Sequence, residues 1–141
     1  MIITAKTECG LTFEQVGASI RQAYHEAVGA PLESVLARWV GLASSAEPLL
    51  LKFEGAPWGE VAKEVYELFS EIIPSFVAPA WGELPGLGRL GWEAVTRQLV
   101  WLFDLSEPLT AEELARSEAR WGAWARLKLA ETEIAPQRRT A

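Results

Sequence analysis

The stretch WGEVAKEVYELFSEII, Trp58 to Ile73, decides the fold class because it has the clearest two-faced pattern in the sequence. At the 100° per residue of an α-helix, its large apolar residues gather on one arc and its glutamates lie on the opposite arc. Pro57 suits the first turn of a helix, and Pro74 cannot continue one. We therefore predict an amphipathic helix on which a core is built, with an apolar face of Val61, Val65, Leu68, Phe69, Ile72 and Ile73.

Two helices are predicted before this stretch. Thr12 and Gln15 form a capping box, and the apolar pattern that follows indicates a helix that ends at Gly29. A second helix is predicted from Pro31 to about Ser44. The apolar run within Ser45 to Gly55 is too short to distinguish a buried strand from a helical turn, and we favour a short helix there.

A long loop and a fourth helix are predicted after this stretch. Residues 74–91 are rich in proline and glycine, so we expect an ordered loop with one helical turn around Phe76 to Trp81. The apolar pattern then resumes, and it indicates a helix from about Gly91 to Asp104.

A break at Pro108 divides the chain into a body and a C-terminal helix. Thr110 and Glu113 form a second capping box, which starts a helix that runs to Thr132. Residues 133–141 are polar and partly basic, and we expect a disordered tail. The fold predicted is all-α: a compact bundle of about five helices with a separate C-terminal helix. The helical body comprises residues 1–109, and the separate helix comprises residues 110–132.

Charge and composition limit the classes of partner. The net charge is −6, with 13 acidic and 7 basic residues up to Leu105 and 6 of each from Ser106 onward. Because nucleic-acid affinity comes chiefly from neutralising phosphates, we expect no direct binding of nucleic acid. The longest apolar runs fall far short of the roughly 20 residues of a membrane span. A single cysteine, Cys9, and a start without a signal-peptide core favour the cytoplasm of a host cell.

No group of residues in the sequence indicates catalysis, a metal site or a cofactor. The stretch GLGRLG, residues 86–91, matches G-x-G-x-x-G, but Pro85 and the lack of a preceding strand favour ordinary loop glycines. His25 is the only histidine, and Cys9 alone cannot define a zinc site. We therefore expect a protein that is not an enzyme and that holds no cofactor or metal.

The seven tryptophans exceed what an ordinary core of this size requires, and Trp is enriched at interface hot spots. Trp101 projects from a polar helix face beside Arg97, where the two side chains are placed for a cation–π contact. Trp121 and Trp124 are three residues apart, so either both are core or one faces a partner. Leu127 lies outside the narrow apolar seam of that helix. These five residues, Trp101, Arg97, Trp121, Trp124 and Leu127, are the predicted partner-binding residues.

The organisation of the whole chain resembles that of small proteins with which phages seize host machinery. The resemblance rests on three features: a helical chain without a recognisable catalytic site, an acidic body rich in Trp, and a separate helix from Thr110 to Thr132. More narrowly, the chain resembles small Thermus phage inhibitors of bacterial RNA polymerase. The resemblance implies binding to the polymerase β flap and the C-terminal region of the σ factor, with inhibition of promoters that depend on a −35 element. It includes no motif, so it assigns no role to a particular residue.

Two other functions remain open. A phage assembly or connector protein is also helical and non-enzymatic, and it binds copies of itself or a tail component. A small-molecule enzyme comes third, because no nucleophile and base can be named in the sequence. We expect the free protein to be a monomer. The host, the contact residues and any effect on elongation or termination are not determined by the sequence.

Overall fold

The computed structural model describes residues 10–29, 36–72 and 79–140, with side chains up to Glu131. Within these ranges the fold is all-α, as predicted, and no β-strand is present. The helices are α1 (Phe13–Val28), α2 (Leu36–Lys52), α3 (Trp58–Ile72), α4 (Gly86–Asp104) and α5 (Ala111–Thr140), with a short 3₁₀ turn, η1 (Trp81–Glu83), before α4.

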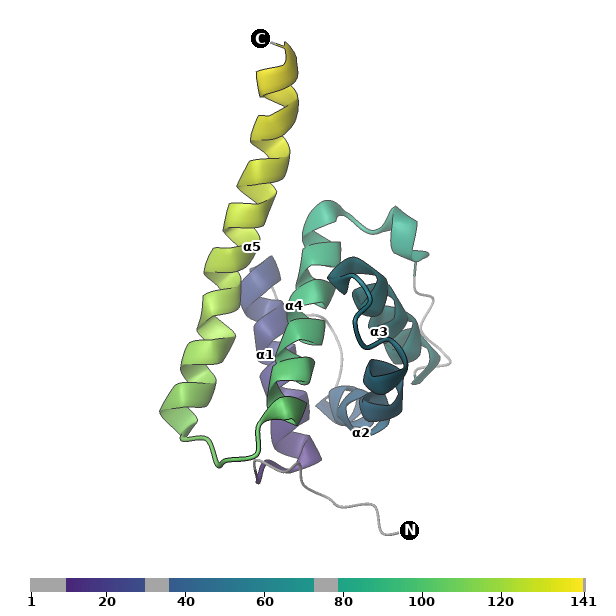
Figure 1. Ribbon diagram of the computed structural model, residues 1–141, viewed down its shortest axis with the longest axis vertical. Helices are drawn as coiled ribbons and strands as arrows, with labels where there is room; N and C mark the ends of the chain where they lie inside the picture. Colours follow the sequence, from purple (N-terminus) through teal and green to yellow (C-terminus); the bar gives the residue numbers. More distant parts are fainter. Residues whose placement is uncertain (1–9, 30–35, 73–78, 141) are drawn as a thin grey trace.

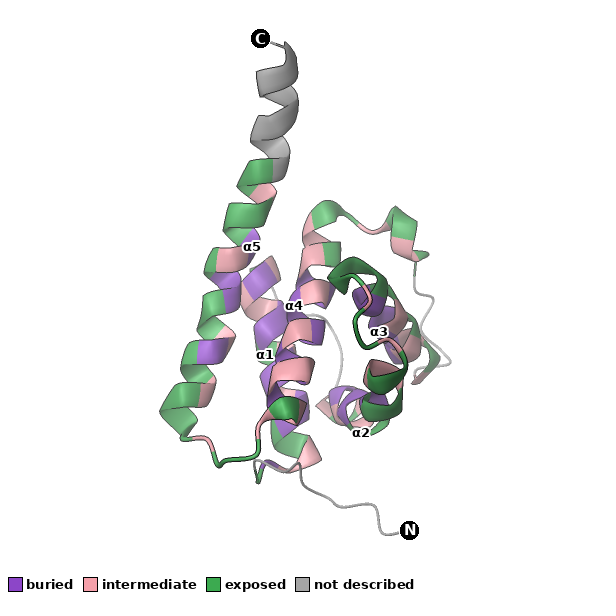
Figure 2. Ribbon diagram, in the orientation of Figure 1, coloured by how far each residue is buried: buried purple, intermediate pink, exposed green. Residues whose placement is uncertain are grey.

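Helices α1 and α4 lie side by side at the centre of the molecule (Figure 1). Helix α5 packs against both of them on one side, whereas α2 packs on α1 and α3 packs on α2 and α4. The C-terminal part of α5 extends beyond the rest of the bundle (Figure 1). Buried residues therefore lie along the inward faces of the helices, and those of α5 are confined to the part that lies against the body (Figure 2).

Both predicted capping boxes are present. The Gln15 backbone N–H donates to the Thr12 hydroxyl at 3.1 Å, and the Thr12 N–H donates to the Gln15 side chain at 2.8 Å. Thr110 and Glu113 make the same reciprocal pair at the start of α5, at 3.1 and 3.2 Å. Gly29 ends α1 with a positive φ of 82°, a conformation that glycine adopts without steric cost.

Helix α2 is longer than predicted. Its start at Pro31 lies outside the described residues, but it continues through Ser44 and Pro48 to Lys52, so the predicted end near Ser44 and the separate short helix are wrong. Pro48 lacks a backbone N–H and therefore cannot donate the helical hydrogen bond. Ala46 is fully buried one turn after Leu42, so core packing continues across the proline and outweighs the lost bond.

Helix α4 begins at Gly86 and not at Gly91, so the interpretation of residues 86–91 as loop glycines is wrong. Pro85 precedes its first turn, and the Pro85 carbonyl accepts a hydrogen bond from the Arg89 N–H at 3.1 Å. Gly91 faces α1, where a Cβ atom would lie within 2.6 to 2.9 Å of the Val28 and Tyr24 side chains. The glycine therefore allows close approach of two helices.

The helical turn expected around Phe76 to Trp81 falls partly outside the described residues, and η1 begins at Trp81.

Helix α5 also exceeds its predicted length, because it continues past Thr132 to Thr140 where a disordered tail was expected. Most residues after Thr132 are good helix formers, and adding a residue to an existing helix costs far less than nucleating a new one. Pro136 is tolerated within this extension.

The main core is aromatic and is centred on Trp92 of α4, which is almost completely buried. Its ring stacks on Trp39 of α2 at 5.5 Å between centroids. Tyr24 of α1 and Tyr66 and Phe69 of α3 surround it at 5.5, 5.3 and 5.0 Å. On the apolar face predicted for α3, Val61, Val65 and Phe69 are buried as expected. Leu68 and Ile72 are partly buried against the same core, and Ile73 lies outside the described residues. One aromatic residue of α4 thus contacts rings from three other helices.

Candidate partner-binding face

Arg97 of α4 lies between two indole rings that come from different helices. Its guanidinium carbon is 4.8 Å from the ring centroid of Trp58, the first residue of α3, and 5.2 Å from that of Trp124 on α5. Glu93, one turn earlier on α4, pairs with the guanidinium at 3.0 Å. Cation–π contacts of this kind are most favourable on Trp. The arrangement joins the start of α3, the outer face of α4 and the middle of α5 into one surface.

Two of the predicted site residues, Arg97 and Trp124, are brought together, but the predicted contact between Arg97 and Trp101 is not formed. The ion pair with Glu93 and the two indoles hold the guanidinium towards the start of α4, away from Trp101, which is one turn later. Arg120 of α5 lies over Trp101 instead, at 5.5 Å. Trp101 is half-buried, so part of its ring faces solvent.

Trp121 is a core residue, which argues against its predicted role in binding a partner. It is buried with Ala23 and Ala27 of α1, Ala94 of α4 and Ala125 of its own helix. Its indole N–H donates to the side-chain oxygen of Gln98 at 2.9 Å. The periodicity of α5 places Trp121 on a narrow apolar seam with Leu114 and Ala125, but it does not show that the small residues receiving the indole lie on α1 and α4.

Gln98 links three helices through a buried set of hydrogen bonds. Its side-chain oxygen accepts from the Ser117 hydroxyl and the Trp121 indole of α5, at 2.8 and 2.9 Å. Its amide nitrogen donates to the Ser19 hydroxyl of α1 at 3.1 Å. A buried polar group whose partners are all present fixes the register of the helices that it joins. The first half of α5 is therefore held in place against α1 and α4.

Glu118 of α5 has its pKa raised by burial, and repulsion from Glu26 of α1 raises it further, whereas a hydrogen bond with Ser19 lowers it. A carboxyl group with a raised folded-state pKa binds its proton more tightly in the folded protein. The stability that it contributes is therefore complete below the unfolded-state pKa, about 4.3, and is lost as pH rises through the folded-state pKa.

We expect Glu118→Gln to raise the melting temperature at neutral pH, because glutamine removes the ionisation but keeps an amide that can bond Ser19. Thermal melts between acid and neutral pH should show a flatter profile for this variant than for the parent. Glu107→Gln, at an exposed position of the α4–α5 connection, is the control. A variant less stable than the parent at neutral pH would contradict the expected sign.

Leu127 lies on the exposed side of α5, with 59% of its surface accessible, as a surface contact residue would. It follows Trp124 by three residues and is therefore a neighbour of that side chain on the helix surface. Among the described residues, the other exposed large hydrophobic side chains are Leu51 and Trp58, at 65% and 37%. Neither of these was predicted as a site residue.

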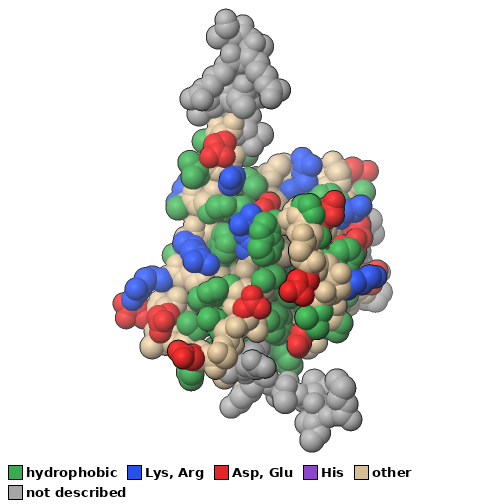
Figure 3. Space-filling model, viewed as in Figure 1, with side chains coloured by type: hydrophobic (Ala, Val, Ile, Leu, Met, Phe, Trp, Pro, Cys, Tyr) green, Lys and Arg blue, Asp and Glu red, His purple; other side chains and the backbone are tan. Residues whose placement is uncertain are grey.

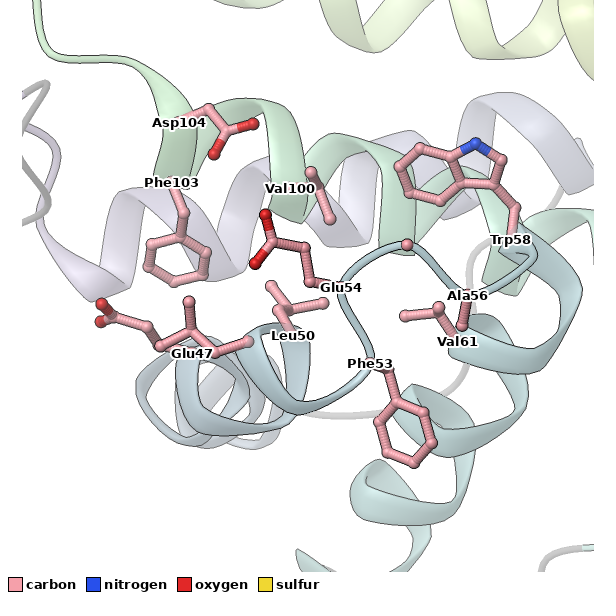
Figure 4. A pocket seen from close by; sticks show the side chains of 12 residues that line it. Glu47, Leu50, Phe53, Glu54, Ala56, Trp58, Val61, Val100, Phe103 and Asp104 are labelled. Atoms are coloured by element: carbon pink, nitrogen blue, oxygen red, sulfur yellow. The ribbon is translucent and has the colours of Figure 1, made fainter.

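A groove of about 500 Å³ lies between the end of α2, the start of α3 and the outer face of α4. Figure 4 shows Leu50, Val100 and Phe103 around its apolar interior, with Trp58 at one end. The face drawn in Figure 3 has hydrophobic side chains at its centre and acidic side chains below them. One sequence signal lay near this groove: the apolar run at residues 49–53, which was predicted as a short helix.

The charged residues that line the groove are all acidic: Glu47, Glu54 and Asp104. All three are exposed, and none forms a salt bridge with a described Lys or Arg. By contrast, Glu93 beside the groove region is neutralised by Arg97. The groove therefore combines an apolar interior with an acidic rim, and the Lys52 ammonium lies 5.5 Å from the ring centroid of Phe53, one of the lining residues.

Other kinds of site have little support in the described ranges. No three His, Cys, Asp or Glu side chains are grouped there closely enough to hold a metal ion. Among the helices of the described part, none has both the length and the apolar composition needed to cross a membrane. Comparison with known proteins gives no further assignment: no protein-family model, curated protein or solved structure matches the chain.

Proposed function

We propose that the protein is a non-enzymatic, phage-encoded regulator that binds bacterial RNA polymerase at the β flap and the C-terminal region of the σ factor. By holding that σ region away from its position, it inhibits transcription from promoters that depend on a −35 element. The observation that carries the proposal is the exposed aromatic and aliphatic surface where α3, α4 and α5 meet. It consists of Trp58, Arg97, Trp101, Trp124 and Leu127.

One property of this surface and one of the whole protein favour a protein partner. Trp and Arg are the residue types most enriched at binding hot spots, and here they are placed together by three helices. The protein has a net charge of −6, which complements a partner whose own DNA-facing surface is basic. The choice of polymerase as that partner comes from the resemblance in chain organisation.

The test is titration of the full-length protein against bacterial RNA polymerase holoenzyme, with Thermus holoenzyme as the first choice. We expect Leu127→Ala and Trp101→Ala to weaken binding by about 1 to 4 kcal/mol wherever the side chain is a hot spot. Leu127→Ala gives the clearer test. Because Leu127 is exposed, its truncation should leave the melting temperature unchanged, so a loss of binding cannot be attributed to a loss of stability. Glu67→Ala, at an exposed position of α3 that lines neither the surface nor the groove, is the matched control.

A transcription assay separates binding from regulation. The protein should inhibit a promoter with a −35 element and should spare an extended −10 promoter that lacks one. Equal inhibition of both promoters would contradict the σ mechanism, and an absence of binding to holoenzyme would contradict the proposal as a whole.

A phage assembly or connector protein is the second candidate, and the observation in its favour is the part of α5 that extends beyond the bundle (Figure 1). Such an extension is suited to packing against another copy. Light scattering over a range of concentrations distinguishes the two functions, because the regulator is expected to remain a monomer and a connector is expected to assemble.

A further inference from the structure

We infer that the groove between α2, α3 and α4 seats a basic amphipathic helix of the partner protein. The inference rests on the proposed function in one respect only: it requires that the protein act by binding another protein. It adds the place where a segment of the partner docks and the chemistry of that segment.

The first support is the distribution of exposed apolar side chains. Leu51 and Trp58 line the groove, and they are two of the three exposed large hydrophobic residues among those described. Val100 and Phe103 of α4 continue the same apolar lining to the left of Trp58 in Figure 4. A contiguous apolar hollow on a monomer surface is typical of a binding site, because its side chains are shielded from water only when a partner binds.

The second support is the charge of the rim. Glu47, Glu54 and Asp104 come from the end of α2, the α2–α3 connection and the end of α4, so acidic groups approach the groove from more than one side. Among the described residues, no Lys or Arg side chain lines it. A partner with Lys or Arg flanking its apolar residues would be attracted, whereas an acidic segment would be repelled.

The form of the partner segment follows from the walls of the groove. The described residues offer no sheet edge to which an extended peptide could add as a strand. An amphipathic helix presents apolar residues at i, i+3, i+4 and i+7 on one side and carries cations on its flanks. That pattern matches an apolar interior with an acidic rim. Trp58 borders the groove and also stacks on Arg97, so the docked helix would lie beside the surface proposed to bind polymerase.

A labelled peptide tests the inference without the polymerase. The probe is a Leu/Lys amphipathic helix of about 18 residues, which makes five turns. One comparison peptide has the same composition in a shuffled order without an apolar face, and another has Glu in place of Lys. Fluorescence anisotropy with the full-length protein should show binding of the amphipathic basic peptide at least tenfold tighter than either comparison peptide, with affinity that falls as salt rises.

Matched variants locate the binding. Asp104→Lys, which reverses a rim charge, and Leu51→Gln, which removes an apolar contact without adding charge, should each weaken binding of the basic peptide tenfold or more. Glu67→Lys changes the net charge as much as Asp104→Lys does, and Ala37→Gln places a glutamine at an exposed position of α2 outside the groove. These two controls should bind the peptide within about twofold of the parent. Because all four positions are exposed, all four variants should fold.

The outcomes separate the inference from the proposed function. Weakening by the groove variants alone supports the inference. Equal weakening by Glu67→Lys, or equal binding of the shuffled peptide, shows attraction to overall charge and overturns it. Binding of a small cationic amphiphile in place of the helical peptide would also overturn it.

If the groove binds the peptide and the protein does not bind holoenzyme, the proposed polymerase function fails and the groove assignment remains. If holoenzyme binds and Leu51→Gln has no effect on either titration, the groove assignment fails alone.

Discussion

Trp92→Ala is expected to lower the free energy of unfolding by about 3 to 5 kcal/mol, the range found for removal of a large buried aromatic side chain. The indole is 2% exposed and contacts four aromatic rings from α1, α2 and α3. Alanine would leave a cavity that these rings cannot fill without leaving their rotamers. The loss is a large fraction of the roughly 5 to 15 kcal/mol that stabilises a domain.

Urea denaturation followed by circular dichroism measures this loss, and Trp92→Phe keeps the comparison quantitative if the alanine variant does not fold. The phenylalanine variant retains an aromatic ring and should lose less stability than the alanine variant. Trp58→Ala is the control for loss of a tryptophan from the surface, since Trp58 is exposed and contributes one cation–π contact of about 0.5 to 1 kcal/mol. A Trp92→Ala protein that unfolds at the same urea concentration as the parent would show that the core is not built around this residue.

Features that depend on neighbouring residues were predictable from the sequence. The capping boxes at Thr12 and Thr110 require residues only three positions apart, and both were located correctly. The amphipathic face of α3 was predictable for the same reason, because its periodicity is contained within one helix. The all-α class followed from patterns of this kind.

Features set by contacts between distant segments were not predictable. Gly91 has the composition of a loop position, but its close packing on Tyr24 and Val28 places it inside α4. Pro48 indicates a helix end by its own chemistry, yet the burial of Ala46 keeps α2 continuous. Local propensity is a weak term beside tertiary packing, so the predicted end of α2 and the predicted start of α4 were shifted, whereas the end of α1 at Gly29 was located correctly.

The candidate site was only partly predictable for a related reason. Arg97 and Trp124 were named because each lies off the apolar arc of its helix, and the structure brings them into contact. Trp58 was not named, because its position beside Arg97 depends on how α3 packs against α4. The acidic groove was missed entirely, since its lining residues come from separate helices that meet only in the folded chain.

Removal of α5 tests how the C-terminal helix is related to the body. The sequence pattern predicts that residues 1–109 form a folded body on their own, because the seam of α5 is narrow. The burial of Trp121 leads us to expect the opposite. A cut after Leu109 would expose Ala23, Ala27 and Ala94, which Trp121 and Ala125 cover in the intact protein. It would also remove two of the three hydrogen bonds to Gln98.

The expected loss is large. Burial of a Trp side chain covers about 150 to 250 Å², which at about 25 cal/mol per Å² corresponds to roughly 4 to 6 kcal/mol before the entropy of ordering the helix is subtracted. The 1–109 fragment should therefore melt at a much lower temperature than the parent and with less cooperativity. Circular dichroism melts of the fragment and the full chain measure this difference.

A second truncation separates the part of α5 that packs from the part that extends. A chain that ends after Ala130 keeps Ser117, Trp121, Gly122 and Ala125, which are the buried residues in the described part of α5. It should melt close to the parent, because only residues beyond the packed half are lost. Trp121→Ala in the full chain should fall between the two truncations, since it removes the indole but keeps the helix. A 1–109 fragment that melts cooperatively near the parent temperature would mean that α5 contributes little to the fold, and the narrow seam would then mark a docking helix as its sequence pattern predicts.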